Sequence, residues 1–249
     1  MSGYKLGLVS ISFRQYSPEE IIKAVKDAGL CCIEWGSDVH APCENIKRLH
    51  EIASLQKDYG IICSSYGTYF NVEKNSANEL QKYIDAAKIL GTKILRLWCG
   101  TKSGDKMSDE EKADLFARCR RIAEIAEEND VILCMECHQG TFIQRAEDVV
   151  NLMEAVSSPA FRMYWQPFQW ISAKESFEFA GIVAPYVEHI HVFNWSGSEK
   201  FSLHEGIKDW CTYLTAFNKP HTLLLEFMPD DRIESLPIEA DALRVIIGG

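Results

Sequence analysis

Residues 93–137 read KILRLWCGTKSGDKMSDEEKADLFARCRRIAEIAEENDVILCMEC, and this stretch contains the pattern that decides the fold. It begins with the short apolar run 93–99 and ends with a second such run, 131–137, as expected for buried strands. Between the two runs, Ser108-Asp-Glu-Glu111 fits a capping box, in which the serine hydroxyl caps a first-turn N–H and the glutamate reaches back. The stretch therefore predicts a strand, a helix and a second strand.

The same alternation of apolar runs and helical patterns continues along the whole chain. Further runs lie near residues 5–11, 31–35, 61–67, 161–166, 187–193 and 221–227. Eight strands alternating with helices over 249 residues are typical of a parallel (β/α)8 barrel. A doubly wound open sheet is the alternative, and it is disfavoured because no G-x-G-x-x-G phosphate turn follows the first run. Since no long Pro/Gly-rich linker interrupts the chain, we predict an α/β fold: a (β/α)8 TIM barrel with a single domain spanning residues 1–249.

The predicted helices carry start and stop signals at the expected distances from the strands. Glycines at positions 29, 60 and 91 stand where helices should end. Apolar residues recur with helical spacing after the start signals, as in Leu80, Ile84, Ala87 and Leu90. Three more capping boxes begin at serines, namely Ser17, Ser76 and Ser172.

Composition and charge exclude several classes of protein. The formal net charge of −10 disfavours nucleic acid as a partner, because an acidic chain repels phosphate backbones. No segment approaches the roughly 20 continuous apolar residues of a membrane span, and the N-terminus lacks the pattern of a signal peptide. The nine cysteines are odd in number and lie in apolar segments, as expected of reduced, mostly buried thiols. Cys134 and Cys137 spell CxxC, but an offset of three places them on opposite faces of a strand. We therefore expect a cytoplasmic protein with no membrane partner.

Polar side chains gather at the predicted C-terminal ends of the strands, where a barrel of this kind carries its active site. Alternation along a strand puts Glu136 on the same face as His138, and His189 on the same face as His191. Such groups inside a barrel would be costly as mere filling, because a buried charge needs a partner. Two glutamates, a histidine and an amide oxygen are together the ligand set of a divalent cation such as Mn²⁺, Mg²⁺, Co²⁺ or Zn²⁺. The strand ends carry Glu34, Trp35, Arg96, Trp98, Glu136, His138, Gln166, Gln169, His189, His191, Trp195 and Glu226.

These motifs, in this order, give the chain a resemblance to the xylose isomerase-like TIM barrels. That superfamily includes sugar phosphate isomerases and epimerases, ketose 3-epimerases, inosose dehydratases and endonuclease IV. The resemblance runs essentially from end to end and is specific for the superfamily rather than for one activity. The segments that carry it are IEWGSDVHAP (33–42), LRLWCG (95–100), MECHQGTF (135–142), HIHVFNW (189–195), SLHEGIKDW (202–210) and LLLEFMPDD (223–231).

Carried over position by position, the resemblance implies a metal held by Glu136, Gln166, His191 and Glu226. Strand 6 is where this chain departs from the family pattern, because the usual Asp falls on Gln166 and its usual His partner on Gln169. A glutamine carbonyl ligates a cation only as a neutral dipole, so metal affinity should fall. Two interpretations stay open: the Gln166 carbonyl binds the cation, or the Gln-x-x-Gln pair binds a sugar hydroxyl.

The resemblance further implies a divalent-metal-assisted sugar isomerase or epimerase that transfers a proton next to a carbonyl through an enediolate. Glu136 and Glu226 would be the catalytic base and acid. The alternatives are a keto-sugar or polyol dehydratase or lyase using the same site, and a non-catalytic sugar-binding barrel. A repair nuclease resembling endonuclease IV is disfavoured, because the further histidines of its additional metals are absent here. The substrate would be a small carbohydrate, bound by Glu34, Arg96, Trp98, His138, Gln169 and Trp195.

Several of these side chains also have a purely structural interpretation. Arg96 could pair with Glu34 or Glu136 as scaffold instead of holding a substrate oxygen. The tryptophans could be ordinary core, and His189 could pack deeper in the barrel. We expect His40 and His204 to be solvated in loops, and His50 to lie on a helix surface. A free sugar is favoured over a sugar phosphate because no basic cluster precedes the last strand. A homo-oligomer is compatible with the sequence, which does not define the sugar or the metal.

Overall fold

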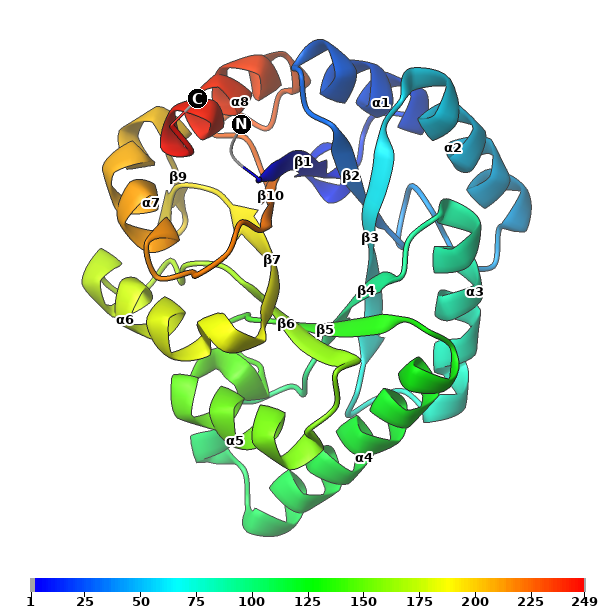
Figure 1. The fold of residues 1–249 in the computed structure, drawn as a ribbon, viewed down its shortest axis with the longest axis vertical. Helices are drawn as coiled ribbons and strands as arrows, with labels where there is room; N and C mark the ends of the chain where they lie inside the picture. Colours follow the sequence, from blue (N-terminus) through cyan, green and yellow to red (C-terminus); the bar gives the residue numbers. More distant parts are fainter. Residues whose placement is uncertain (1–2, 249) are drawn as a thin grey trace.

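The structure, a computed structural model, describes residues 3–248, and its central feature is a closed barrel of eight parallel strands. The strands follow the order β1-β10-β7-β6-β5-β4-β3-β2 around the barrel. Figure 1 shows the strands in the centre with the helices forming a ring outside them. The (β/α)8 fold predicted from the sequence is confirmed. The strands are β1 (Lys5–Val9), β2 (Cys32–Gly36), β3 (Ile62–Asn71), β4 (Ile94–Trp98), β5 (Ile132–Glu136), β6 (Phe161–Trp165), β7 (Val187–Val192) and β10 (Thr222–Leu225).

Within residues 3–248, eight α-helices surround the barrel, and several of their starts carry the caps that the sequence signals. The four predicted capping boxes form at Ser17, Ser76, Ser108 and Ser172. A fifth, at Ser202, was not predicted. Gly29, Gly60 and Gly91 all adopt positive φ where helices end. The helices are α1 (Pro18–Asp27), α2 (Ile46–Tyr59), α3 (Leu80–Leu90), α4 (Asp109–Glu128), α5 (Ala146–Val156), α6 (Ala173–Val183), α7 (Ile207–Leu214) and α8 (Leu236–Ile246).

The barrel closes where β1 meets β2 and β10, and this seam depends on a glycine. Gly7 pairs with Cys32 on one side and with Leu224 on the other. A Cβ atom at Gly7 would lie 2.4 Å from the Cys32 sulfur and 2.8 Å from Leu224 Cδ2. Such contacts are too short for any side chain, so the close approach of the three strands requires glycine here.

The sequence analysis was wrong about the end of the first strand. Residues Ser10–Phe13, in part predicted as strand, form a 3-10 helix instead. The physical reason is side-chain hydrogen bonding: the Ser10 hydroxyl accepts from the Gly36 N–H at 2.9 Å, and the Ser12 hydroxyl accepts from the Phe227 N–H at 2.8 Å. The turn thus ties the end of β1 to the ends of β2 and β10.

Two other features at the C-terminal ends of the strands were not predicted. β3 extends to Asn71, which pairs with Trp98 of β4 beyond a register shift. After β7 the chain forms a small antiparallel hairpin of β8 (Trp195–Ser196) and β9 (Glu199–Lys200). Both features raise walls around the end of the barrel that carries the polar residues.

Side chains alternate between two apolar layers along each strand. The larger layer packs between strands and helices, and it includes Trp35, whose indole N–H donates to Gln56 at 2.6 Å. The smaller layer fills the barrel itself, with Val9, Cys32, Cys134, Tyr164 and Leu224 at its centre. All nine cysteines are free; Cys31 and Cys211 are exposed and the others are buried. None of the helices within residues 3–248 is long and apolar enough to cross a membrane.

Candidate active site

Five ionisable side chains from five strands meet inside the barrel at its C-terminal end. Side chains along a strand alternate with a period of two, so these five point into the barrel, as do the residues two positions before them. All five are almost completely buried, with exposed fractions of 0–5%. They are Glu34 of β2, Arg96 of β4, Glu136 of β5, His191 of β7 and Glu226 directly after β10.

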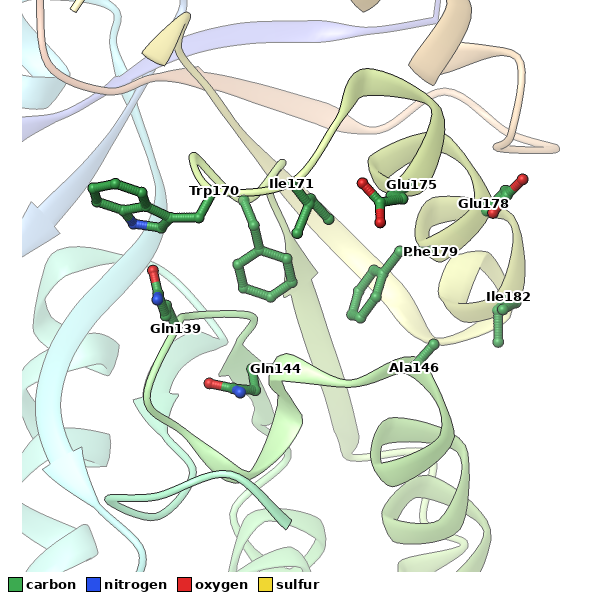
Figure 2. A pocket seen from close by; sticks show the side chains of 10 residues that line it. Gln139, Gln144, Ala146, Trp170, Ile171, Glu175, Glu178, Phe179 and Ile182 are labelled. Carbon is green, nitrogen blue, oxygen red and sulfur yellow. The ribbon is translucent and has the colours of Figure 1, made fainter. Parts of the chain in front are cut away.

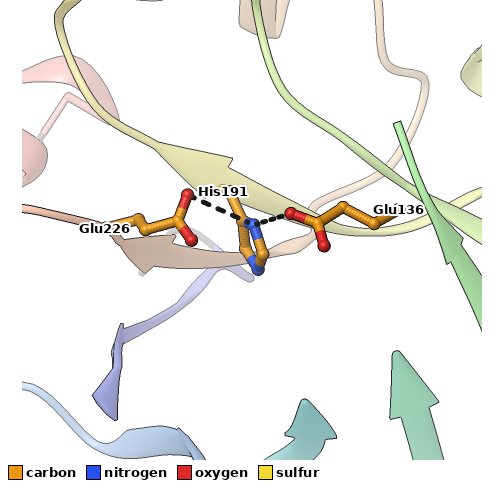
Figure 3. Close-up of side chains that lie close together, drawn as sticks. All are labelled: Glu136, His191 and Glu226. Carbon is orange, nitrogen blue, oxygen red and sulfur yellow. Dashed lines mark ion pairs between the residues drawn. The ribbon is translucent and has the colours of Figure 1, made fainter. Parts of the chain in front are cut away.

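His191 is the centre of this group. Its Nδ1 atom lies 3.5 Å from Glu226 Oε2 and 3.7 Å from Glu136 Oε1. The side-chain oxygen of Gln166 is 3.1 Å from the same nitrogen. Figure 3 shows Glu136 and Glu226 reaching the imidazole from opposite sides. The residues predicted as metal ligands therefore do come together, and they converge on one ring nitrogen.

A network of charge lies on the far side of the histidine. His191 Nε2 lies 3.6 Å from Glu34 Oε1. Glu34 Oε1 also accepts from Arg96 Nε at 3.0 Å, and its other oxygen accepts from the Ser65 hydroxyl at 2.8 Å. Arg96 in turn donates through Nη1 to Glu136. Arg96 thus bridges two glutamates within the barrel.

The pKa values of the two glutamates beside His191 Nδ1 are shifted in opposite directions. Burial alone would raise the pKa of Glu136, but Arg96 and then His191 outweigh it and lower that pKa below its ordinary value. Burial raises the pKa of Glu226 to about 7, and the negative charge of Glu136 adds to this effect. At neutral pH one carboxyl group is therefore ionised while the other is near its midpoint.

The pKa of His191 also depends on the carboxylates. Burial favours the neutral ring, but Glu226 and Glu34 outweigh it and raise the pKa of His191 to about 10. With a neutral histidine, three glutamates and one arginine would leave two uncompensated negative charges in the barrel. Protons on His191 and Glu226 balance that charge.

The donor atoms also fit a divalent cation. A metal about 2.1 Å from each ligand places neighbouring ligand atoms about 3.0–3.5 Å apart at octahedral or tetrahedral angles. The separations of 3.1, 3.5 and 3.7 Å from His191 Nδ1 to Gln166, Glu226 and Glu136 are close to that range. Within residues 3–248, ligand atoms of Glu136, His191 and Glu226 all lie within 4.8 Å of one another. A dication would supply the two positive charges that protons otherwise provide.

A cavity of about 290 Å³ opens directly above these residues. Its floor includes Glu136, Gln166 and Glu226, and Arg96 also faces it. The Arg96 guanidinium lies 5.7 Å from the centre of the Trp98 ring, in cation–π contact. The remaining walls are formed by Ile11, Arg14, Tyr69, Trp98, His138, Gln169, Phe193, Trp195 and Phe227.

Five of the six residues predicted to bind substrate line this cavity, namely Arg96, Trp98, His138, Gln169 and Trp195. The sixth, Glu34, lies below the cavity, is fully buried and makes its contacts with protein groups. His138 Nδ1 lies 2.7 Å from the Gln139 carbonyl oxygen, so Nδ1 carries the hydrogen and Nε2 is the basic nitrogen of the neutral ring. Its ring packs against Trp98 with centroids 4.7 Å apart.

Other histidines and aromatics take structural positions. His40, expected to be solvated, is 1% exposed and contacts the Ser10 hydroxyl and the Tyr16 carbonyl at 3.1 and 3.2 Å. That expectation was wrong, because the 3-10 turn after β1 folds over the loop that carries His40. His189 packs deeper in the barrel against Tyr164, with ring centroids 5.2 Å apart. His204 and His50 are exposed, as expected.

Sequence reasoning missed several residues that line the cavity. Arg14 and Tyr69 come from the ends of the first and third strands, and Phe227 directly follows Glu226. Arg14 donates to Asp38 and to the Tyr69 hydroxyl, both at 2.7 Å. Their positions in the sequence could have indicated them, because in a barrel the C-terminal end of every strand faces the active site, including those of the first and third strands. Phe227 adopts a φ of 55°, which is rare for an aromatic residue and directs its ring toward Trp195.

A second cavity, of about 370 Å³, lies beside the first, between the loops that follow β5 and β6. Figure 2 shows Trp170 at one end of it and Ile182 at the other, with Ile171 and Phe179 between them. The ionisable residues that line it, Glu175 and Glu178, are exposed on α6. Glu175 is engaged in the capping box of Ser172. The apolar lining lacks the converging groups that proton transfer needs, so the first cavity is the candidate active site.

Comparison with known proteins agrees with this fold. Residues 22–235 match the family described as xylose isomerase-like TIM barrel, and the chain belongs to that family. The chain is similar to the structure of the probable 3-DHS dehydratase AsbF of Bacillus anthracis, with 19% identity, a TM-score of 0.76 and coverage of 96% of this chain and 98% of the other. It is also similar to a D-allulose 3-epimerase of Methylomonas sp., with 12% identity, a TM-score of 0.74 and coverage of 99% of both chains. A third similar structure is a xylose isomerase-like TIM barrel protein of Mycobacterium smegmatis in complex with magnesium, with 14% identity, a TM-score of 0.72 and coverage of 100% and 99%.

Proposed function

We propose that the protein is a divalent-metal-assisted isomerase or epimerase, which moves a proton next to the carbonyl group of a sugar or sugar derivative. One observation carries the proposal: Glu136 and Glu226 approach His191 from opposite sides, line the same cavity and have pKa values shifted apart. Pairs of carboxyl groups with separated pKa values are the usual acid and base of an enzyme that works near neutral pH.

Glu136 is suited to the role of the base. Arg96 holds its carboxylate in the ionised form, so it can accept a proton from a carbon next to a carbonyl. Glu226 is suited to the opposite role, because it faces the same cavity from the other side of His191 and can return a proton there. Two such groups on opposite sides of an enediolate return the proton to the other face or to the neighbouring carbon, which are the outcomes of epimerisation and isomerisation.

The cation would be held by Glu136, His191 through Nδ1, Glu226 and the neutral oxygen of Gln166. When bound, a divalent cation polarises a substrate carbonyl and makes the adjacent C–H more acidic. The interatomic separations described above support this assignment, and so does the magnesium in a structure of similar fold. We favour the interpretation of Gln166 as a ligand, because its oxygen faces the same nitrogen as both glutamates.

The cavity walls suit a small polyhydroxylated substrate. Trp98, Trp195 and Phe227 offer flat apolar faces of the kind that pack against sugar rings. Gln169 and His138 offer polar groups for hydroxyls. The D-allulose 3-epimerase with a similar fold supports a ketose as substrate class.

Dehydration is the second candidate function, and the position of His138 in the cavity wall favours it. Elimination requires a base for the proton next to the carbonyl and an acid for the hydroxyl that leaves the next carbon. His138 adds a third proton-exchanging group, because its Nε2 is free of the backbone contact that occupies Nδ1. The similar fold of the probable 3-DHS dehydratase supports the same chemistry.

Deuterium exchange tests the proposal and separates the two candidates. The protein loaded with Mn²⁺ would be incubated in D₂O with a panel of ketopentoses, ketohexoses and 3-DHS. An isomerase or epimerase incorporates deuterium at the carbon next to the carbonyl, as NMR detects, and forms a second sugar. A dehydratase instead produces a conjugated product with ultraviolet absorbance. Metal-loaded protein that exchanges no proton of any compound in the panel would overturn the proposal.

A further inference from the structure

We propose that Glu34 is a positioning residue, which holds the His191 ring with Nδ1 toward the cation site and supplies, from behind the ring, a negative charge that the neutral Gln166 does not. The inference rests on the proposed function in that it assumes a cation at Nδ1. It assigns to Glu34 a role other than the contact with substrate expected from the sequence.

Glu34 lies outside the cavity and is enclosed by protein groups. Its exposed fraction is 0%, and it does not belong to the cavity lining. A buried carboxylate without solvent or substrate contact is expensive unless protein groups satisfy it. Ser65 satisfies one oxygen at 2.8 Å, and Arg96 satisfies the other at 3.0 Å. Glu34 is therefore held rigidly from two sides.

The His191 ring lies between Glu34 on one edge and the proposed cation site on the other. Glu34 Oε1 is 3.6 Å from His191 Nε2, a buried nitrogen that has no hydrogen-bond partner among residues 3–248. On the opposite edge of the ring, Nδ1 faces Glu136, Gln166 and Glu226. If Nδ1 gives its lone pair to a cation, the remaining hydrogen must reside on Nε2, and Glu34 is the acceptor in front of it. A carboxylate behind a ligating histidine fixes the ring and makes the ligand nitrogen more basic.

Glu34 also adds to the negative charge around the proposed cation site. Only two of the four ligand groups are carboxylates, and Gln166 stands where a third carboxylate could be. Glu34 contributes a third carboxylate to the same buried cluster without contacting the ion. Glu34 also pairs with Arg96, and Arg96 holds Glu136 ionised. The same carboxylate thus supports two ligands of the site, His191 directly and Glu136 through Arg96.

Metal titration of matched variants tests this role. Glu34→Gln keeps the size of the side chain and a carbonyl oxygen for Arg96, but removes the charge. Ser65→Ala is the control, because it removes the hydrogen bond to the Glu34 oxygen that faces away from His191. Mn²⁺ affinity measured by calorimetry should fall 10- to 100-fold in Glu34→Gln, by analogy with other residues behind metal ligands. It should change less than about threefold in Ser65→Ala, with both variants folded by circular dichroism.

A second measurement on the unmodified protein removes the dependence on a folded variant. In protein labelled with ¹⁵N at histidine and loaded with Zn²⁺, long-range NMR correlations should show His191 with hydrogen on Nε2 and metal on Nδ1. Metal on Nε2 would overturn the inference, and so would equal Mn²⁺ affinity of Glu34→Gln and the unmodified protein. If the unmodified protein itself binds neither ion, the proposed function fails as well, which is a different result from a selective failure of the Glu34 assignment.

Discussion

Two histidines lie two residues apart on β7, both are buried against the Tyr164 ring, and their polar surroundings differ. His189 lies in the lower layer of the barrel, between the Tyr164 ring and the Ser64 carbonyl, and burial lowers its pKa. His191 lies in the upper layer, where Glu226 and Glu34 raise its pKa to about 10 despite complete burial. The backbone treats the two positions alike, so the carboxylates of the neighbouring strands make the difference.

The same contrast holds for the other strands. The lower layer is filled by residues such as Cys32, Cys134 and Leu224, and each is followed two positions later by a glutamate of the upper layer. Packing explains the lower layer, because it excludes water and gains free energy from apolar burial. It does not explain the upper layer, where three buried carboxylates must be compensated by Arg96 and by protons. We therefore assign the proposed function to the upper layer.

Among substitutions that distinguish the two layers, Glu136→Gln in the upper layer is expected to have the largest effect on activity. The substitution keeps size and polarity but removes the carboxylate that we assign as the base. We expect proton exchange with a substrate in D₂O to fall by about 10²–10⁴-fold, since general bases contribute about that much. The unfolding midpoint in urea should change little in comparison. Unaltered exchange in this variant would refute the role of Glu136.

A substitution in the lower layer should reduce stability and leave activity nearly unchanged. Leu224 is 0% exposed and pairs with the seam glycine of β1. Leu224→Ala should reduce the free energy of unfolding by about 2–5 kcal/mol, because it leaves a cavity in the barrel. In the fraction that stays folded, kcat should remain within about threefold of the original. Greatly reduced kcat with unchanged stability would mean that the two layers are not functionally separate.

The pH dependence of metal binding tests the charge balance of the upper layer. A cation competes with the protons of Glu226, whose pKa is about 7, and His191, whose pKa is about 10. Binding should therefore release about two protons below pH 7 and about one between pH 7 and 10, and affinity should fall as pH falls. Calorimetry in buffers of different ionisation enthalpy measures that number. Proton release near zero at pH 6 would contradict the assignment of these ligands.

The smallest expected effect concerns the neutral ligand. Gln166→Glu places a third carboxylate at the oxygen that lies 3.1 Å from His191 Nδ1. Mn²⁺ affinity should rise by about tenfold, because hard cations bind more strongly as the charge of their ligands increases. Competition with a fluorescent chelator gives the ratio. An unchanged affinity would favour the other interpretation, in which Gln166 contacts a substrate hydroxyl instead.

The fold could be predicted almost completely from the sequence, because its signals are local. Alternating apolar runs mark the strands, and capping boxes at Ser17 and Ser108 mark helix starts through hydrogen bonds within four residues. The 3-10 turn after β1 could not be predicted in this way. It depends on the contacts of Ser10 and Ser12 with backbone groups of strands that are distant in sequence.

The sequence predicted which residues belong to the candidate site better than it predicted where each side chain lies within it. Strand ends and alternation gave a list of polar residues, and the family resemblance selected Glu136, His191 and Glu226 from it as ligands. That Glu34 lies behind His191 instead of in the cavity could not be inferred, because it depends on how β2 and β7 face each other across the barrel. Arg14 was missed because it directly follows the 3-10 turn, beyond the end of the predicted first strand.

The central claim is that Glu136, His191 and Glu226 together hold a divalent cation. Crystals of the protein soaked in Mn²⁺, with diffraction data collected at the manganese absorption edge, test it most directly. We expect an anomalous peak about 2.0–2.3 Å from His191 Nδ1 and from one oxygen of each glutamate. Ordered crystals with those three side chains clearly visible and no anomalous peak between them would contradict it.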